Sequence, residues 1–153
     1  MLSGIAHVSF TVSDLEKSLH FYRDLLGFRV EMEVERSGPD VEGITGIRGS
    51  RLKIGFLTLD GFTLELIQYV SPIGERLDLR TNNVGCAHVA FYVKDMGKAY
   101  DFLSSKGIRF KSRPNEAKAG AFAGGKVVYL LDPDGITLEL IQRPQDVSQE
   151  TSP

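Results

Sequence analysis

Several residue types are scarce in this 153-residue chain: it has one cysteine, no tryptophan and three histidines. The single cysteine, Cys86, excludes an internal disulfide, so we expect a protein of the reducing cytoplasm. No apolar run is long enough to span a bilayer, and no membrane partner is expected. The first residues lack the basic start of a signal peptide and have the alternation of a strand.

The chain also lacks a charge excess of either sign. Eighteen Lys and Arg residues stand against 20 Asp and Glu, and the formal net charge is -2. Because the two signs are interleaved and form no basic stripe, nucleic acid is not expected as a partner. A hydrophobic content of 42% is enough to bury a core.

What the chain does have is an internal repeat. HVSFTVSD at 7–14 matches HVAFYVKD at 88–95 in five of eight positions, and LDGFTLELIQ at 59–68 matches PDGITLELIQ at 133–142 in eight of ten. The matches occur in the same order, which indicates a duplicated module. The first pair is 81 positions apart and the second 74, so the second copy shortens the polar, glycine-rich stretch at 37–50.

Each copy has the pattern of a βαβββ module. In the first copy, alternate apolar residues from Val8 to Val12 predict a strand. A helix follows, with Ser13 and Glu16 as a capping box and Gly27 at its end. Three more strands are predicted at 28–36, 51–59 and 62–70, and Asp60-Gly61 marks a hairpin turn.

The second copy repeats this order. Its first strand is predicted at 86–93, and its helix begins after Asp95 and ends at Gly107. The predicted strands that follow are 108–113, 126–131 and 136–143, with a turn at Pro133-Asp134-Gly135. We therefore expect an α+β fold in which two tandem βαβββ modules form an open, curled mixed β-sheet cleft. The expected divisions are one domain at 1–143, with modules 1–70 and 86–143 and a linker 71–85, and a disordered tail at 144–153.

Strand alternation places one His and one Glu of each copy on the sheet face away from the helix. The helix must cover an apolar face, so His7 and Glu65 point to the opposite face of their strands. The same alternation places His88 and Glu139 in the second copy. Because apolar residues share this face with the His and Glu, it is better explained as the wall of a cleft than as solvent surface.

Imidazole and carboxylate together are typical ligands of a divalent metal ion. One of each from both copies would give a site of two His and two Glu, while the third histidine, His20, is expected to be an exposed helix residue. Each residue alone has an ordinary structural explanation, as a strand His or as the polar half of an amphipathic strand. The repeat favours the metal site, because both residue types recur at matched places.

These motifs resemble the vicinal oxygen chelate superfamily, which includes glyoxalase I, methylmalonyl-CoA epimerase, extradiol dioxygenases and the bleomycin and fosfomycin resistance proteins. The resemblance rests on HVSFTVSDLEKSLHFYRDLLGF, DGFTLELIQ, HVAFYVKD and DPDGITLELIQ, which extend over both copies up to Arg143. It implies paired modules forming an open barrel around one metal ion (Zn, Ni, Co, Mn or Fe). The ligands that it implies are His7, Glu65, His88 and Glu139.

The full ligand set is similar to that of the glyoxalase I and epimerase branches. Extradiol dioxygenases use a 2-His-1-carboxylate site, and Glu65 fills the fourth position here. Thr11 and Tyr69 stand where glyoxalase I commonly carries an Arg and an Asn for glutathione. Ser71-Pro72-Ile73 and the segment GAFAGGK resemble the epimerase, although the DPDG ending does not.

The resemblance implies a lyase or isomerase (epimerase) that moves a proton next to a carbonyl through a metal-chelated enediolate or enolate. Glu65 and Glu139, one from each copy, are the predicted catalytic carboxylates, with Asp40 and Glu42 as alternative bases. The expected partner is a small oxygenated molecule, with anionic and CoA-linked acids among the candidates, and the expected assembly is a homodimer. The alternatives are an extradiol-type dioxygenase and a non-catalytic protein that binds an antibiotic or another small ligand.

Two glycine-rich segments, 37–50 and 117–125, have two possible roles, either as lids over the cleft or as flexible connections. Cations near them are candidates for holding an anionic group, or are simply solvated. They are Arg48, Arg51, Lys53, Lys118 and Lys126.

Overall fold

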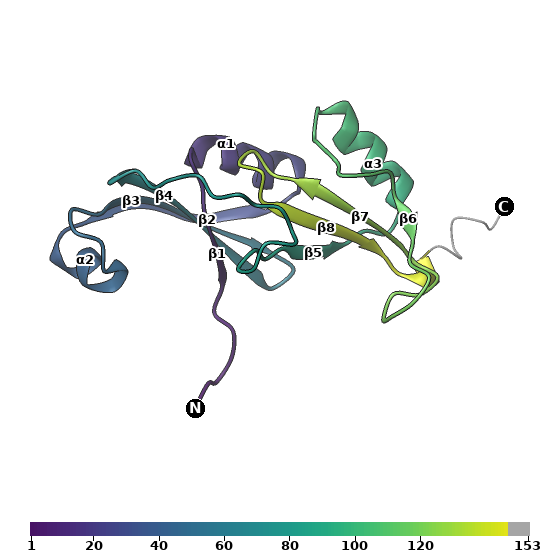
Figure 1. The fold of residues 1–153 in the computed structure, drawn as a ribbon, viewed down its shortest axis with the longest axis horizontal. Coiled ribbons are helices and arrows are strands. Elements are labelled where there is room, and N and C mark those ends of the chain that lie inside the picture. The colour runs from purple at the N-terminus through teal and green to yellow at the C-terminus, as the bar shows by residue number, and fades with distance from the viewer. Residues whose placement is uncertain (147–153) are drawn as a thin grey trace. The chain divides into compact units, whose positions relative to one another are not determined.

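The computed structural model describes residues 1–146. The chain divides into two compact units, Met1–Leu77 and Asp78–Pro153, which run from purple to teal and from teal to yellow in Figure 1. Of the tail that we predict at 144–153, residues 147–153 lie outside the described residues. Within residues 1–146 no helix has the length and apolar character that crossing a membrane requires.

The first unit is a four-stranded mixed sheet with a helix between its first two strands. Its sheet order is β1-β4-β3-β2, with β1 parallel to β4 and the other neighbours antiparallel. Val8 pairs with Leu64 in the parallel ladder. The elements are β1 (Val8–Thr11), α1 (Leu15–Leu19), a π-helical continuation η1 (His20–Leu25), β2 (Arg29–Ser37), α2 (Pro39–Thr45), β3 (Arg51–Leu59) and β4 (Phe62–Ser71).

The second unit repeats this topology. Its sheet order is β5-β8-β7-β6, again with the first and last strands parallel, and Val89 pairs with Leu138. The elements are β5 (Val89–Tyr92), α3 (Met96–Ser105), β6 (Asn115–Glu116), β7 (Lys126–Leu131) and β8 (Thr137–Gln142). The predicted α+β fold of two tandem βαβββ modules is therefore confirmed.

In both units the helix covers the sheet face that alternation assigns to it. Leu19 and Tyr22 are buried against a sheet that contributes Leu64 and Leu66, all at 1% exposure or less. In the second unit Met96 of α3 is buried together with leucines of β8. Burial of each such side chain is worth about 1.5–3 kcal/mol. The opposite sheet face, which carries the predicted ligands, is left without a helix of its own unit.

Two segments differ from the sequence prediction. The stretch 37–50 is not a plain loop, because it contains α2 at the end of the β2–β3 hairpin (Figure 1). Pro39 is the first residue of this helix, and Val41 is its buried side chain. Gly46 follows the last residue of the helix and has a φ of 70°. The strand predicted at 108–113 is reduced to a single bridge, Phe110 to Leu130, before the two-residue β6.

At the start of each helix, an aspartate side chain and a glutamine side chain accept hydrogen bonds from backbone amides of the first turn. Asp14, not Ser13 with Glu16 as predicted, accepts from the Lys17 amide, and Asp95 accepts from the Lys98 amide as expected. The side chain of the glutamine that ends each LELIQ motif accepts a hydrogen bond from the backbone amide of the first residue of the helix in its unit. Gln68 Oε1 accepts from Leu15 N at 2.9 Å, and Gln142 Oε1 accepts from Met96 N at 3.1 Å.

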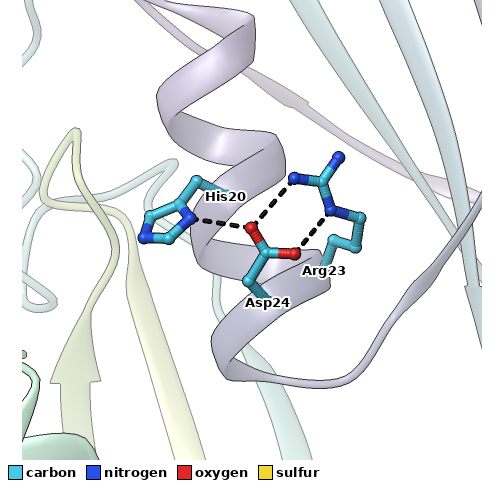
Figure 2. Close-up of polar contacts among 3 residues, drawn as sticks. All are labelled: His20, Arg23 and Asp24. Atoms are coloured by element: carbon cyan, nitrogen blue, oxygen red, sulfur yellow. Dashed lines mark hydrogen bonds and ion pairs between the residues drawn. The ribbon is translucent and has the colours of Figure 1, made fainter.

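The predicted first helix changes from α to π geometry at His20. Figure 2 shows the surface cluster at this point: the Asp24 carboxylate lies 2.7 Å from His20 Nδ1 and accepts from Arg23 Nε at 2.6 Å. His20 is exposed, as expected, and contacts Asp24 one turn away. Hydrogen bonds from Arg23 and then His20 hold the pKa of the Asp24 carboxyl well below its ordinary value.

Replacing Asp24 with Asn should lower the melting temperature slightly at neutral pH. The folded-state pKa of Asp24 is depressed, so its stabilisation is complete above the unfolded-state value of about 3.9 and is lost as pH falls below it. The difference between wild type and variant should therefore be constant near neutrality and shrink in acid. Thermal melts across pH test this, with Asp101→Asn on α3 as the matched surface control. A difference that grows in acid would contradict the assignment.

Candidate metal centre

The first His–Glu pair is built by the parallel pairing of β1 with β4. Glu65 lies opposite Ser9 in this ladder, and His7 is two positions before Ser9 on the same face. The distance from His7 Nε2 to Glu65 Oε2 is 3.3 Å. The Glu65 side chain is only 13% exposed, whereas that of His7 is 40% exposed, so the carboxylate is largely withdrawn from water.

The second pair has the same construction in the other unit. Glu139 lies opposite Ala90 in the β5–β8 ladder, and His88 again stands two positions earlier. His88 Nε2 and Glu139 Oε2 are 3.2 Å apart, with side-chain exposures of 37% and 17%. The two pairs thus agree in strand register, ring nitrogen, distance and burial, as expected of copies of one site element.

An aromatic ring packs against each imidazole from the strand beside the glutamate. Phe56, which pairs with Glu65 across β3 and β4, contacts His7 edge to face at 6.1 Å between centroids. Tyr129, which pairs with Glu139, lies 5.2 Å from the His88 ring. Sequence reasoning missed both rings, although their place opposite each LEL glutamate, ahead of the turn, was a usable signal. They restrict how the imidazoles can turn.

The geometry within each pair suits a divalent ion. Two ligands at about 2.0–2.2 Å from one ion lie roughly 3.0–3.5 Å apart when the angle between them is from 90° to tetrahedral. The observed separations of 3.3 and 3.2 Å fall in that range. In neither unit do the described residues gather three or more His, Cys, Asp and Glu side chains, so each unit offers two ligands. The four-ligand set from both units stays a prediction.

The other sequence-predicted candidates have their own partners in the first unit. Asp40 on α2 forms an ion pair with Arg36 at 2.7 Å, and this hydrogen bond lowers the pKa of its carboxyl. Glu42 accepts from the Gly49 amide at 3.0 Å and so closes the turn after α2. Both alternative bases are therefore engaged in holding α2 and its flanking turn. Among the predicted cations, Lys53 lies 3.7 Å from Glu35.

Comparison with known proteins points to the superfamily that the sequence motifs resemble. The chain matches a family model described as the Glyoxalase/Bleomycin resistance protein/Dioxygenase superfamily over residues 4–140. It is 29% identical over 150 residues to 2-epi-5-epi-valiolone epimerase of an Actinomyces species, which covers 92% of this chain and 80% of that one.

Two further proteins are similar to this chain over most of both sequences. Ethylmalonyl-CoA/methylmalonyl-CoA epimerase of Cereibacter sphaeroides is 32% identical over 148 residues, covering 93% of this chain and 99% of the relative. The crystal structure of a glyoxalase family protein from Bacillus cereus has a TM-score of 0.79 at 20% identity, over 93% of this chain and 95% of that one. The latter likeness shows the same fold.

Proposed function

Because this chain belongs to the glyoxalase/bleomycin resistance protein/dioxygenase superfamily, we propose that it is a divalent-metal-dependent isomerase or lyase that moves a proton next to a carbonyl. The observation that carries the proposal is the matched pair of His–Glu contacts, one in each module, at 3.3 and 3.2 Å. Both pairs lie on the sheet face that the module's own helix does not cover. Epimerases among the relatives support this reaction class.

The ligands in this proposal are His7, Glu65, His88 and Glu139. Imidazole and carboxylate suit a borderline ion, so Zn, Ni, Co, Mn and Fe are all compatible with the donor set. When bound, such an ion supplies Lewis acidity to neighbouring oxygens of the substrate. A cytoplasmic homodimer that acts on a small oxygenated molecule completes the proposal.

The two glutamates are the groups that move the proton. Glu65 and Glu139 are 13% and 17% exposed and lie beside His7 and His88, and a carboxylate held in place in this way can act as a general base. One comes from each module, so one can remove a proton from the carbon beside a carbonyl while the other returns it. Two bases of this kind are what inversion at a carbon requires.

The substrate class in this proposal is a small or CoA-linked acid. Thr11 is exposed on β1 and Tyr69 is half-buried on β4, where glyoxalase I would carry its glutathione-binding Arg and Asn. An epimerase relative whose name gives CoA-linked acids as substrates supports the same class. Methylmalonyl-CoA is therefore a sensible first probe.

Metal analysis of ligand variants tests the site directly. The purified wild type should bind one divalent ion per chain, whereas Glu65→Gln and His88→Ala should each lower the affinity by at least about a hundredfold, because a direct ligand matters no less than the groups that orient it. Titration with Zn²⁺ or Mn²⁺ followed by calorimetry gives the affinities. His20→Ala removes the one histidine outside the pairs and should leave binding unchanged. Full occupancy in both ligand variants would contradict the proposal.

A further inference from the structure

An arginine stacks on a tyrosine on the same face of the second sheet as the His88–Glu139 pair. Tyr92 is the last residue of β5 and pairs with Ile141 of β8, and Arg143 follows directly after β8. The Arg143 Cζ atom lies 4.5 Å from the centroid of the Tyr92 ring. Tyr92 is 59% exposed, so one side of this stacked pair is open to solvent.

The glycine-rich segment 117–125 packs beside this stacked pair. The Phe122 ring meets the Tyr92 ring edge to face at 6.4 Å. A side chain on Gly125 would collide with the Gln142 carbonyl, so glycine is required for this close approach. The segment is therefore not simply a flexible connection, since it holds an aromatic ring against the residues next to Arg143.

The guanidinium of Arg143 retains hydrogen-bonding capacity in this arrangement. Among residues 1–146 its carboxylate neighbour is Asp146, at 3.5 Å from Nε, which is beyond the distance of a strong charge-assisted hydrogen bond. A guanidinium is a planar fork that binds carboxylate or phosphate through two parallel N–H bonds. The contact with the Tyr92 ring restricts where that fork can lie.

The spacing on the sheet sets the length of a ligand that could reach both features. Glu139 and Arg143 are four positions apart on one chain, and so are His88 and Tyr92. At about 3.3 Å per residue, the two features lie roughly 13 Å apart along the strands. A ligand with oxygens at the His–Glu pair would therefore meet Arg143 only through a group roughly 13 Å farther along the strands.

We propose that Arg143, stacked on Tyr92, is an anion-binding subsite of the substrate site and takes the carboxylate or phosphate at the far end of an elongated substrate. This assignment rests on the proposed function for the position of the substrate's oxygenated end. The subsite itself consists of residues of the second unit, and its affinity for an anion does not require a metal.

The test is calorimetric titration of the metal-free full chain, in chelator, with phenyl phosphate, benzoate and neutral benzyl alcohol. Arg143→Gln should weaken binding of the anion by at least about tenfold, the effect of losing a hydrogen bond to a charged group. Tyr92→Leu should weaken it by about two- to fivefold, and Tyr92→Phe should not. The stronger of phenyl phosphate and benzoate identifies the anionic group, and benzyl alcohol should not bind.

A matched control exists on the helix of the same unit. Lys106 also lies over an aromatic ring, 5.7 Å from the Phe102 centroid, and Lys106→Gln removes the same charge away from the subsite. Unchanged anion affinity in Arg143→Gln, equal losses in Lys106→Gln, or no anion binding by the wild type would overturn the subsite. His88→Ala should still bind the anion, so a failure of the metal site would be distinguishable from a failure of the subsite.

Discussion

Glu139→Gln should slow inversion of the substrate by roughly 10²–10⁴-fold while leaving the fold intact. Gln has the shape of Glu and keeps a side-chain oxygen beside His88, where the Glu139 carboxylate lies 3.2 Å from Nε2. It loses the carboxylate that accepts a proton. Loss of a positioned general base lowers turnover by roughly 10²–10⁴-fold. Glu65→Gln should have a similar effect, because Glu65 has the same register and burial in the first module.

The stereochemistry of solvent exchange distinguishes this role from plain metal ligation. With methylmalonyl-CoA or a related carbonyl acid in D₂O, NMR should show that each variant, loaded with metal, still exchanges the proton of one stereoisomer only. The two variants should retain opposite stereoisomers. Glu42→Gln is the control, since that carboxylate closes the α2 turn. If both metal-loaded variants interconvert the stereoisomers at the wild-type rate, neither glutamate is the base.

Gln142→Leu should be the most destabilising of the simple side-chain replacements considered for this chain. The Gln142 side chain is fully buried, and it accepts from Met96 N at 3.1 Å and donates through Nε2 to the Lys94 carbonyl at 2.9 Å. Leucine fills a similar volume but leaves both backbone groups without that partner. Each buried group left unpaired costs about 1–3 kcal/mol, so a loss of about 2–4 kcal/mol is expected.

Urea denaturation of the full chain measures this loss. Gln145→Leu makes the same chemical change at an exposed position nearby and should leave the unfolding free energy almost unchanged. Gln68→Leu should cost less than Gln142→Leu, because Gln68 is half-buried and makes one such bond, to Leu15 N. An unfolding free energy of Gln142→Leu equal to that of the wild type would show that water or a shift of α3 satisfies the two groups.

The elements that local patterns specify were predictable to the residue. β3 and β7 have the predicted bounds, 51–59 and 126–131, because alternation and the flanking turns both constrain them. Asp60 and Gly61 both have positive φ, 48° and 78°, as a tight hairpin turn requires. Strand alternation also predicted that the His and the Glu of each copy share the sheet face away from the helix, and in each unit they lie within 3.3 Å of each other there.

Features that depend on tertiary contacts were not predictable in this way. α2 has only one buried side chain, Val41, so its sequence carries almost no helical periodicity. The glutamine after each LELI segment looked like an ordinary strand end, and only the fold brings it to a helix terminus fifty or so positions away. The stacking of Arg143 on Tyr92 likewise follows from the β5–β8 register and not from sequence spacing.

The parallel pairing of the first and last strands has a consequence for the order of events during synthesis. His88 and Glu139 are 51 positions apart and meet only when β8 joins β5. A His–Glu pair of this kind cannot exist in a partly emerged module, because its second member is in the last strand of that module. The first module can finish this closure while the second is still being translated. In the proposed function, the His7–Glu65 pair would therefore form before the His88–Glu139 pair. Metal binding by all four residues would wait for the second module to fold.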